Sequence, residues 1–293
     1  MSITSSVTDY KYENGRRYHA YREGKYLLPN DEAEQDRLDL HHHIFRLMLG
    51  GHLYRAPISA GVQRVLDYGT GTGIWAIDFA DEYPAAIVIG TDLSPIQPEW
   101  APPNCKFYVD DVESDWVFKP NEAFDFIHGR SMCGSIFDFD ALYGKCYKHL
   151  KPGGWVELQE FEAWIWQIDD PESKKIPNIS KWLGYIDEAS TKIGKRFNVA
   201  TKQKQKLIDA GFINVHDDIY PVFSATKYVY SFILTQSLGS RRYLAKGPEA
   251  QRAWIVSTRA HDSLRGGLHS GPLHSCPRLV HSGVPSHHGG RER

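Results

Sequence analysis

A glycine-rich segment directly follows a short apolar run and is the strongest chemical signal in the chain. Asp67 precedes Gly69, Gly71 and Gly73, which have the spacing G-x-G-x-G. Glycines at a strand-to-helix turn let the backbone bend tightly and approach a ligand, because no Cβ stands in the way. Ile74 takes the place of the last glycine of the dinucleotide fingerprint, and the Gly-Lys-Ser/Thr of a P-loop is missing. The Asp67 carboxylate would repel a phosphate and suits a ligand that carries an ammonium group.

Two further acidic positions follow predicted strands. Asp92 closes the second predicted strand, where a carboxylate can accept hydrogen bonds from both ribose hydroxyls of a nucleoside. Asp110 and Asp111 follow the third predicted strand, where a carboxylate can accept a hydrogen bond from an adenine amine. The alternative for these aspartates is a helix-capping or turn role, and the adjacent pair leaves the choice between Asp110 and Asp111 open.

A parallel sheet would bring these residues together. The apolar runs that read as strands are 62–68, 86–91, 106–109, 124–128, 155–159 and 213–220. The runs between them that read as helices are 74–83, 138–150 and 202–210. Strands that alternate with helices predict an α/β fold with a doubly wound, mostly parallel sheet. Ligands bind such sheets at the carboxyl ends of the strands, where the glycine-rich segment lies.

A helical extension precedes this pattern. Asp31 followed by Glu34 has the spacing of a helix N-cap with its acidic partner, so we predict a helix over 32–50. The run HHH at 41–43 falls inside this helix. Consecutive helical residues point in different directions, so these three side chains cannot share one metal ion. We therefore expect no metal site.

The composition excludes several classes of protein. The chain has 293 residues, of which 41% are hydrophobic, and a formal net charge of −2, so we do not expect a nucleic-acid binder. No apolar run reaches the roughly 18 residues of a membrane span, so we expect no membrane partner. Four cysteines lie far apart without a C-x-x-C pair, which suits a reducing compartment, the cytoplasm or the nucleus.

The C-terminal stretch differs from the rest. Residues 224–293 hold 10 Lys+Arg and 3 Asp+Glu, a net of +7, whereas residues 1–223 hold 24 and 33, a net of −9. The stretch has neither a helical nor a strand period and offers little apolar surface, so we expect a disordered basic tail. We hypothesise that an unspliced intron or a shifted reading frame produced residues 222–293. The run 228–235 has strand propensity and is the candidate for a substitute strand.

The motifs together resemble those of the class I S-adenosylmethionine-dependent methyltransferases. That family has an acidic residue before G-x-G-x-G, acidic residues after strands two and three, and a turn like KPGG at 151–154 before strand five. Within it, the chain is similar to the fungal LaeA-like methyltransferases over about residues 10–221. The stretches that carry this similarity are YENGRRYHAY at 12–21, YLLPNDE at 26–32, EQDRLDLHH at 34–42, DDVESDW at 110–116 and FDFIHGR at 124–130.

The resemblance implies a Rossmann-like fold and a division of the chain. Residues 1–58 would form an N-terminal extension that includes a lid, residues 59–223 the methyltransferase domain, and residues 224–293 the atypical tail. Class I enzymes add an antiparallel seventh strand after strand six, and the sequence departs from the family near residue 222. We therefore expect the sheet to lack that strand and to keep an open edge.

The resemblance also implies roles for individual residues. Asp67, Gly69, Gly71 and Gly73 would flank the methionine part of S-adenosylmethionine, Asp92 would hold its ribose, and Asp111 and Val112 would meet its adenine. Gly129 and Arg130 would lie beside the methionine and the transferring methyl group. Candidates for a general base are His19, His128, Tyr18 and Tyr21, although a structural role is the stronger reading for each. Trp164 and Trp166 are candidates for the substrate pocket, with core packing as the alternative.

The activity implied is methyl transfer to an unidentified acceptor. Members of the family include regulators of fungal secondary metabolism that act with velvet-type partners. Two alternatives are open: a cofactor-binding but catalytically inactive regulatory scaffold, and a nicotinamide oxidoreductase, which Ile74 disfavours.

Overall fold

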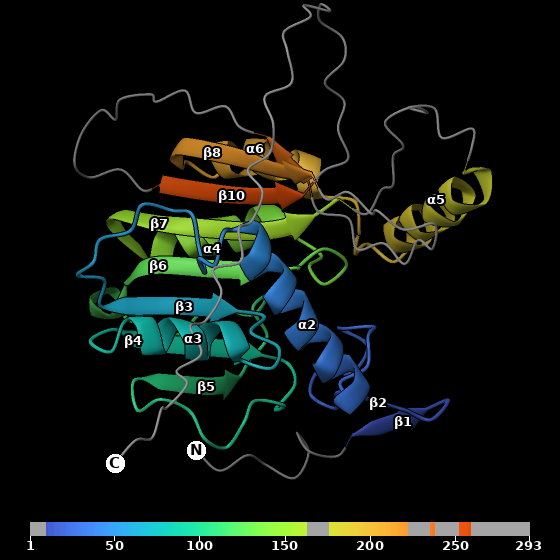
Figure 1. Cartoon of the computed structure of the whole chain (residues 1–293), viewed down its shortest axis with the longest axis horizontal. Coiled ribbons are helices and arrows are strands. Elements are labelled where there is room, and N and C mark those ends of the chain that lie inside the picture. Colours follow the sequence, from blue (N-terminus) through green and yellow to red (C-terminus); the bar gives the residue numbers. More distant parts are fainter. Residues whose placement is uncertain (1–9, 163–175, 222–234, 238–251, 259–293) are drawn as a thin grey trace, which may run out of the picture. The chain divides into compact units, whose positions relative to one another are not determined.

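A largely parallel sheet forms the centre of the protein in a computed structural model that describes residues 10–162, 176–221, 235–237 and 252–258 (Figure 1). The strand order among these residues is β5-β4-β3-β6-β7-β10-β8-β9. All neighbours pair in parallel except β8 and β9. The strands are β3 Arg64–Tyr68, β4 Ile87–Asp92, β5 Cys105–Val109, β6 Phe124–Arg130, β7 Leu150–Phe161, β8 Ile213–Pro221, β9 Thr235–Ser237 and β10 Arg252–Thr258.

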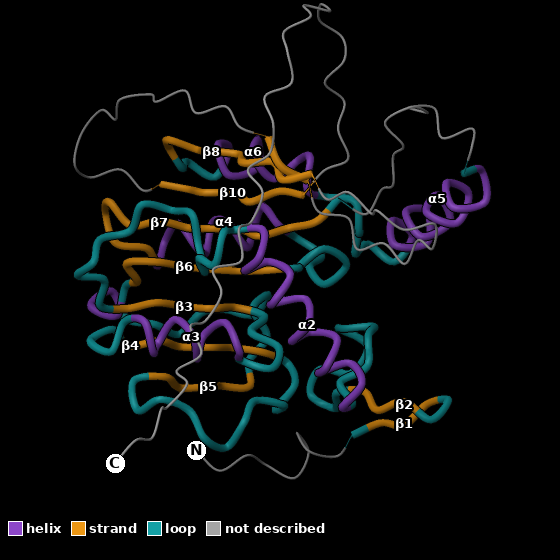
Figure 2. The backbone as a smooth tube through the Cα atoms, in the orientation of Figure 1, coloured by secondary structure: helices purple, strands orange, loops and turns teal. Residues whose placement is uncertain are grey.

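Helices follow β3, β6 and β7 along the chain, whereas β4 leads to β5 without a helix among the described residues (Figure 2). The helices are α2 Glu32–Met48, α3 Ile74–Glu82, α4 Phe139–His149, α5 Pro177–Lys192 and α6 Ala200–Asp209, with a short 3-10 turn η1 at Pro120–Glu122. A separate hairpin of β1 Lys11–Glu13 and β2 Arg16–Tyr18 precedes α2. The predicted doubly wound α/β fold is confirmed. Among the described residues, the helices lack the length and apolar character needed to cross a bilayer.

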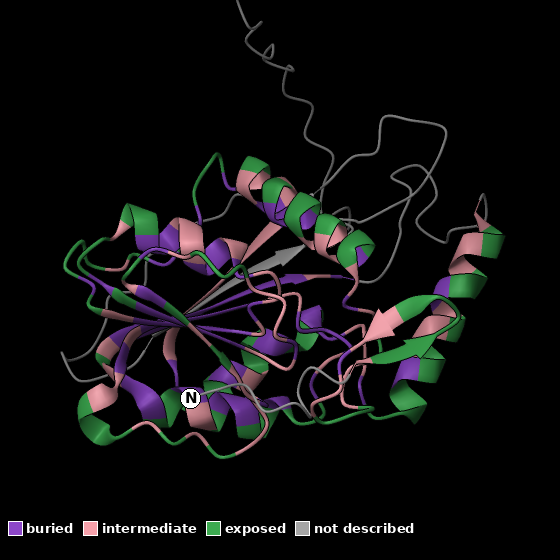
Figure 3. Ribbon diagram, turned by 90° about the horizontal axis from the view of Figure 1, so that it is seen from below, coloured by how far each residue is buried: buried purple, intermediate pink, exposed green. Residues whose placement is uncertain are grey.

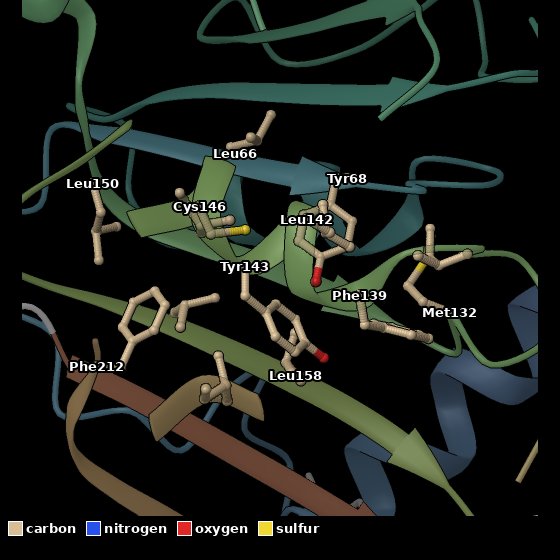
Figure 4. Packing of buried hydrophobic residues seen from close by; sticks show 14 of the residues in the cluster. Leu66, Tyr68, Met132, Phe139, Leu142, Tyr143, Cys146, Leu150, Leu158 and Phe212 are labelled. Atoms are coloured by element: carbon tan, nitrogen blue, oxygen red, sulfur yellow. The ribbon is translucent and has the colours of Figure 1, made fainter. Parts of the chain in front are cut away.

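The inner strands consist mostly of buried residues, and helices cover both faces of the sheet (Figure 3). Successive residues of β3 alternate, so that Leu66 and Tyr68 join one core cluster and Val65 the other. The first cluster packs against α4, where Tyr143 and Cys146 are fully buried (Figure 4). The second packs against α3. This two-sided burial explains why the strands read as continuous apolar runs.

The helix α2 begins as predicted, at an aspartate cap. The Asp31 side chain accepts a hydrogen bond from the Glu34 backbone N–H at 3.1 Å. Figure 1 shows α2 beside the arrowheads of β3, β6 and β7, the carboxyl ends of the parallel strands. The Thr72 hydroxyl donates to the Asp39 carboxylate at 2.6 Å, which attaches α2 to the glycine-rich loop. The N-terminal extension therefore lies against the ligand-binding end of the sheet.

The structure differs from the sequence expectation at 252–258. These residues fall in the range expected to be disordered, yet they form β10, which pairs with both β7 and β8. The apolar run there, AWIV at 253–256, is too short to show a strand period. The strand forms because each edge finds a backbone partner, a gain that local sequence does not reveal. The expectation of an open edge is therefore wrong here, because β10 pairs in parallel with both β7 and β8.

Two other expectations concern the same stretch. Of the run 228–235, Thr235 begins β9 and the rest lies outside the described residues. The origin of residues 222–293 in an intron or a shifted frame stays a prediction.

The helix α5 was not predicted, since it starts at Pro177, contains Gly184 and buries only Leu183 and Ser190.

Candidate active site

A cavity of about 950 Å³ opens at the carboxyl ends of the parallel strands. This volume lies at the upper end of the roughly 300–1,000 Å³ typical of small-molecule sites. Its wall combines the ends of β4 and β6, the loops after β3 and β5, the segment before α2, and α5. The residues predicted from the sequence that line it are Gly69, Gly71, Asp92, Asp111, Val112 and Arg130.

A small recess of about 40 Å³ adjoins the cavity behind the glycine-rich loop. Asp67 and His128 line this recess, and Gly69, Gly71 and Arg130 line both spaces. The structure therefore brings most of the predicted cofactor residues together from four segments that are distant in sequence.

The three glycines of the loop all adopt positive φ. The angles are +63° at Gly69, +59° at Gly71 and +81° at Gly73. A Cβ on Gly69 would lie 2.4 Å from Sδ of Met132, and one on Gly73 would lie 2.6 Å from Cζ of Phe107. Gly73 is the N-cap of α3 and lines neither space. Gly69 and Gly71 thus expose backbone to a ligand, whereas Gly73 allows close packing.

The carboxylate of Asp92 is oriented by the backbone on both sides. Its Oδ2 accepts from the Gly71 N–H and its Oδ1 from the Ser94 N–H, each at 2.8 Å. Burial raises the pKa of Asp92, and these hydrogen bonds oppose that shift. Each carboxylate oxygen can accept a second hydrogen bond. Asp92 can therefore accept hydrogen bonds from the hydroxyl groups of a ribose bound in the cavity.

The acidic pair after β5 also reaches the cavity. Asp111 is nearly fully buried, and its Oδ1 accepts from the Glu113 N–H at 2.9 Å. Asp110 accepts from the Asp111 N–H at 2.9 Å, and burial raises the pKa of Asp110. Both residues line the cavity, so the structure leaves both as possible partners for an adenine amine.

Comparisons with known proteins decide the family. A family model described as a methyltransferase domain matches residues 40–217. A fungal protein named methyltransferase pytC, from Aspergillus terreus, is 45% identical over 77% of this chain and 70% of its own length. The chain belongs to the LaeA-like class I S-adenosylmethionine-dependent methyltransferases.

Two further relatives carry regulatory or substrate names. The secondary metabolism regulator LAE1 of Cochliobolus heterostrophus is 41% identical over 72% of this chain and 69% of its own length. The protein-methionine methyltransferase laeA of Emericella nidulans is 39% identical over 74% of this chain, which spans 58% of that relative. The predicted family, the predicted methyltransferase activity and the link to secondary-metabolism regulators are confirmed.

In this methyltransferase, His128 holds Asp67 rather than facing the large cavity. Its Nδ1 donates to Asp67 Oδ1 at 2.7 Å, while the Thr70 hydroxyl donates to Asp67 Oδ2 at 2.5 Å. The imidazole stacks on Trp75 with ring centroids 3.7 Å apart and an interplanar angle of 5°. Burial lowers the pKa of His128, which keeps the ring neutral. The structure thus gives His128 a positioning role.

The predicted lid residues lie in the extension but not on the cavity. His19 is buried, its Nδ1 donates to the Tyr21 carbonyl at 3.0 Å, and its Nε2 accepts from the Tyr26 N–H at 3.2 Å. Tyr18, His19 and Tyr21 are absent from the walls of both spaces. The cavity is instead lined by residues 25–30, which His19 shapes through the backbone. Closure of a lid stays a prediction.

The remaining predicted site residues are Gly129, Trp164 and Trp166. Gly129 is buried in the sheet, and a Cβ there would lie 2.2 Å from Cζ of Tyr68. Its small size is therefore required by packing. Trp164 and Trp166 lie outside the described residues. Among the described residues, no group of three or more His, Cys, Asp or Glu is placed to hold a metal ion.

His41 is a site residue that the sequence analysis considered only as a metal ligand. It lines both the cavity and the recess, and burial lowers the pKa of His41 to about 3, with Arg130 and Arg37 adding to the effect. The ring makes an edge contact with Phe45, with centroids 4.9 Å apart. The spacing of His41 and Phe45, one helical turn apart on α2, was the signal that could have placed it on the inner face.

The far wall of the cavity is apolar and was also missed. It comes mainly from α5, which the sequence analysis did not predict, and from the ends of neighbouring segments. The apolar residues of this far wall are Ile136, Phe161, Ile179, Trp182, Leu183, Ile186, Ile193 and Phe197.

Proposed function

We propose that this chain binds S-adenosylmethionine in the large cavity and transfers its methyl group to an apolar acceptor. The single observation that supports the cofactor site most strongly is the pairing of Gly71 with Asp92 across the cavity wall. The backbone of Gly71 lines the cavity, so a ligand can approach the turn closely. The Asp92 carboxylate can accept hydrogen bonds from ribose hydroxyls. Asp110 or Asp111 would meet the adenine, and the recess beside Gly69 would take the methionine end.

When bound, S-adenosylmethionine supplies a methyl group on a positively charged sulfur whose leaving group is a neutral thioether. The chain's own residues then have to align the acceptor with that methyl group and exclude water. The apolar far wall of the cavity would face the acceptor, and we refer to it as the acceptor wall. It suits an apolar acceptor, and a base is needed only if the nucleophile must lose a proton. His41 is neutral at physiological pH and a weak base, because its pKa is lowered to about 3.

These features favour a thioether as the acceptor. A methionine side chain is apolar and attacks through a sulfur lone pair without losing a proton. The name of the Emericella relative, a protein-methionine methyltransferase, supports the same class. The name of the Aspergillus terreus relative specifies no acceptor.

The regulatory side of the proposal has separate support. The relatives named as secondary metabolism regulators support a role in controlling fungal secondary metabolism. The three cysteines within the described residues are free, which fits the cytoplasm or the nucleus. Velvet-type partners stay a prediction that co-purification would test. A scaffold that binds cofactor without turnover is the alternative.

Calorimetry with S-adenosylhomocysteine tests the cofactor site. The full chain should bind, and Gly71→Arg should lose binding while remaining folded, because the new side chain fills the cavity. Thermal shift gives a second readout, since ligand at 100 times its Kd stabilises by about 2.7 kcal/mol. A folded wild-type chain that binds no S-adenosylhomocysteine would contradict the proposal.

Mass spectrometry of methyl transfer tests the acceptor wall. Leu183→Arg places a charge in that wall and should abolish transfer to methionine peptides while S-adenosylhomocysteine still binds. Tyr185→Arg is the matched control, because Tyr185 is exposed on the same helix. Cofactor binding without transfer to any acceptor by the wild type would favour the scaffold.

A further inference from the structure

The entrance of the large cavity exposes apolar side chains to solvent. Leu27, Trp182 and Ile193 line the cavity, yet their exposed fractions are 49%, 59% and 46%. Phe137, which is 48% exposed, adjoins the turn after α5, since a Cβ on Gly194 would lie 3.2 Å from Cδ1 of Phe137. Single apolar residues scattered over a protein surface are normal, whereas a group of them around an opening marks a binding surface.

Two lysines flank the Phe137 ring at this entrance. The Lys25 Nζ lies 5.0 Å and the Lys195 Nζ 4.3 Å from the ring centroid, and both lysines line the cavity. The Lys195 Nζ also donates to the backbone carbonyls of Lys25 and Ser135, so the fold fixes its position. Burial lowers the pKa of Lys195, and the charge of Lys25 adds to this effect. Two positive charges are therefore held close together.

No carboxylate within the described part of the chain forms an ion pair with either lysine. The Glu113 carboxylate acts on Lys195 from beyond ion-pair distance. It accepts hydrogen bonds from the Phe137 N–H at 2.9 Å and from the Asp138 N–H at 3.1 Å. The entrance thus combines apolar side chains with two lysines, and charge complementarity favours an acidic ligand.

The residues that surround the opening form the entrance surface, which consists of Lys25, Leu27, Phe137, Trp182, Ile193 and Lys195. We propose that this surface binds a polypeptide segment whose methionine side chain enters the cavity, and that it selects segments with acidic residues beside that methionine. This inference rests on the proposed methyl transfer to a methionine. The apolar residues of the segment would contact Leu27 and Trp182, and its carboxylates would meet the two lysines.

The exposed apolar side chains favour a polypeptide over a free small acceptor. A small molecule is largely enclosed by its site, so it needs no apolar surface outside the cavity. A nucleic acid would require a stripe of basic residues, whereas the entrance surface holds two lysines among four large apolar side chains. A polypeptide satisfies both features, because its backbone extends beyond the methionine and brings acidic neighbours to the lysines.

Calorimetry on the full chain saturated with S-adenosylhomocysteine tests the proposal. Three peptides share one central methionine and differ only in its two neighbours, which are glutamate, glutamine or lysine. The wild type should bind the glutamate peptide at least about fivefold more tightly than the lysine peptide, as expected for charge pairs near a surface. Added salt should weaken the glutamate peptide more than the glutamine peptide, because salt screens exposed charges.

Variants assign the preference to this surface. Lys25→Glu should remove the preference for the glutamate peptide, because a carboxylate then stands beside Lys195. Lys202→Glu, at an exposed position of α6 outside the cavity wall, is the matched control and should keep the preference. Trp182→Ala should weaken all three peptides, whereas Trp100→Ala, which is exposed and does not line the cavity, should weaken none. If Lys25→Glu fails to fold, the wild-type order and its salt dependence decide.

The possible failures are distinguishable. Equal affinity of the wild type for the three peptides, or binding of none of them beside bound S-adenosylhomocysteine, would overturn this inference and leave the cofactor site intact. N-acetylmethionine amide bound as tightly as the glutamate peptide would assign the site to a small acceptor and would also overturn it. So would a dimer in sedimentation that Trp182→Ala dissociates, because a second copy would then cover the surface. A folded wild type that binds no S-adenosylhomocysteine would refute the proposed function itself.

Discussion

Asp67 and His128 lie directly opposite each other on the adjacent strands β3 and β6, joined by a buried hydrogen bond of 2.7 Å. The same carboxylate belongs to the cofactor motif, so a residue 61 positions away in the sequence sets its orientation. A neutral imidazole that donates to a buried carboxylate stabilises the folded state as well as the site.

His128→Phe should therefore destabilise the protein. The substitution keeps an aromatic ring against Trp75 but leaves the buried Asp67 without one donor, which costs about 1.5–3 kcal/mol for a hydrogen bond to a charged group. Urea unfolding measures the loss. His43→Phe on the exposed side of α2 is the control and should change the free energy of unfolding by less than about 0.5 kcal/mol. Equal values for the two variants would contradict the role of His128.

Gly129→Ala tests whether this glycine serves packing. Its Cβ would overlap the buried Tyr68 ring, so we expect a loss of about 1–3 kcal/mol in unfolding free energy. The change in S-adenosylhomocysteine affinity should be small once the variant is folded. Gly144→Ala in α4 is a matched control, because a Cβ there meets open space and should stabilise the helix by about 0.5–1 kcal/mol. A stable Gly129→Ala that loses the ligand would indicate direct contact instead.

Glu160 should make stability depend on pH. Burial raises the pKa of Glu160 to about 7 from its ordinary value of 4.5, although its oxygens accept from the Met132 and Cys133 N–H groups. The folded state then binds the proton more tightly. Its stabilising contribution is complete below pH 4.5 and is lost as the pH rises through 7, with a slope of up to about 1.4 kcal/mol per pH unit.

Glu160→Gln removes this titration. Urea unfolding between pH 4.5 and 7.5 should show the variant gaining stability relative to wild type as the pH rises. Glu99→Gln, at an exposed position, should show a constant difference. A constant difference for Glu160→Gln as well would show that Glu160 stays ionised in the folded protein across this range.

Lys195→Met should weaken the attachment of residues 25–30, the segment before α2 that lines the cavity. The buried Lys195 Nζ donates to the carbonyls of Lys25 and Ser135, and so joins the N-terminal extension to the loop after β6. Without it, amide hydrogen exchange should rise at residues 21–30 and S-adenosylhomocysteine should dissociate faster. Lys192→Met, which breaks only an exposed pair with Glu188, is the control. Unchanged exchange in Lys195→Met would refute this attachment.

Val256→Pro tests β10. The strand pairs with β7 and β8, and proline removes a backbone N–H from a strand with partners on both sides. We expect a loss of stability of at least about 1–3 kcal/mol, the cost of a buried acceptor left without its donor, measured by thermal and urea unfolding. Val256→Ala keeps the N–H and should cost less. A proline variant as stable as wild type would show that β10 contributes nothing to the fold.

The sequence by itself determined the α/β architecture and the cofactor motif, because both depend on local order. The glycines after β3, the acidic ends of β4 and β5 and the Asp31 cap are read from neighbours along the chain. The family likeness rests on the same contiguous stretches. For these elements the local pattern and the tertiary fold agree.

Only the tertiary structure decided which residues that are distant in sequence contact one another at the site. His128 donates to Asp67, Arg130 donates to His42, and α5 supplies much of the apolar far wall of the cavity. Each of these contacts joins segments that no short sequence window contains. Strand β10 forms for the same reason, since its stability comes from backbone partners on β7 and β8. Local sequence encodes propensity, whereas burial and pairing of distant groups depend on the fold as a whole.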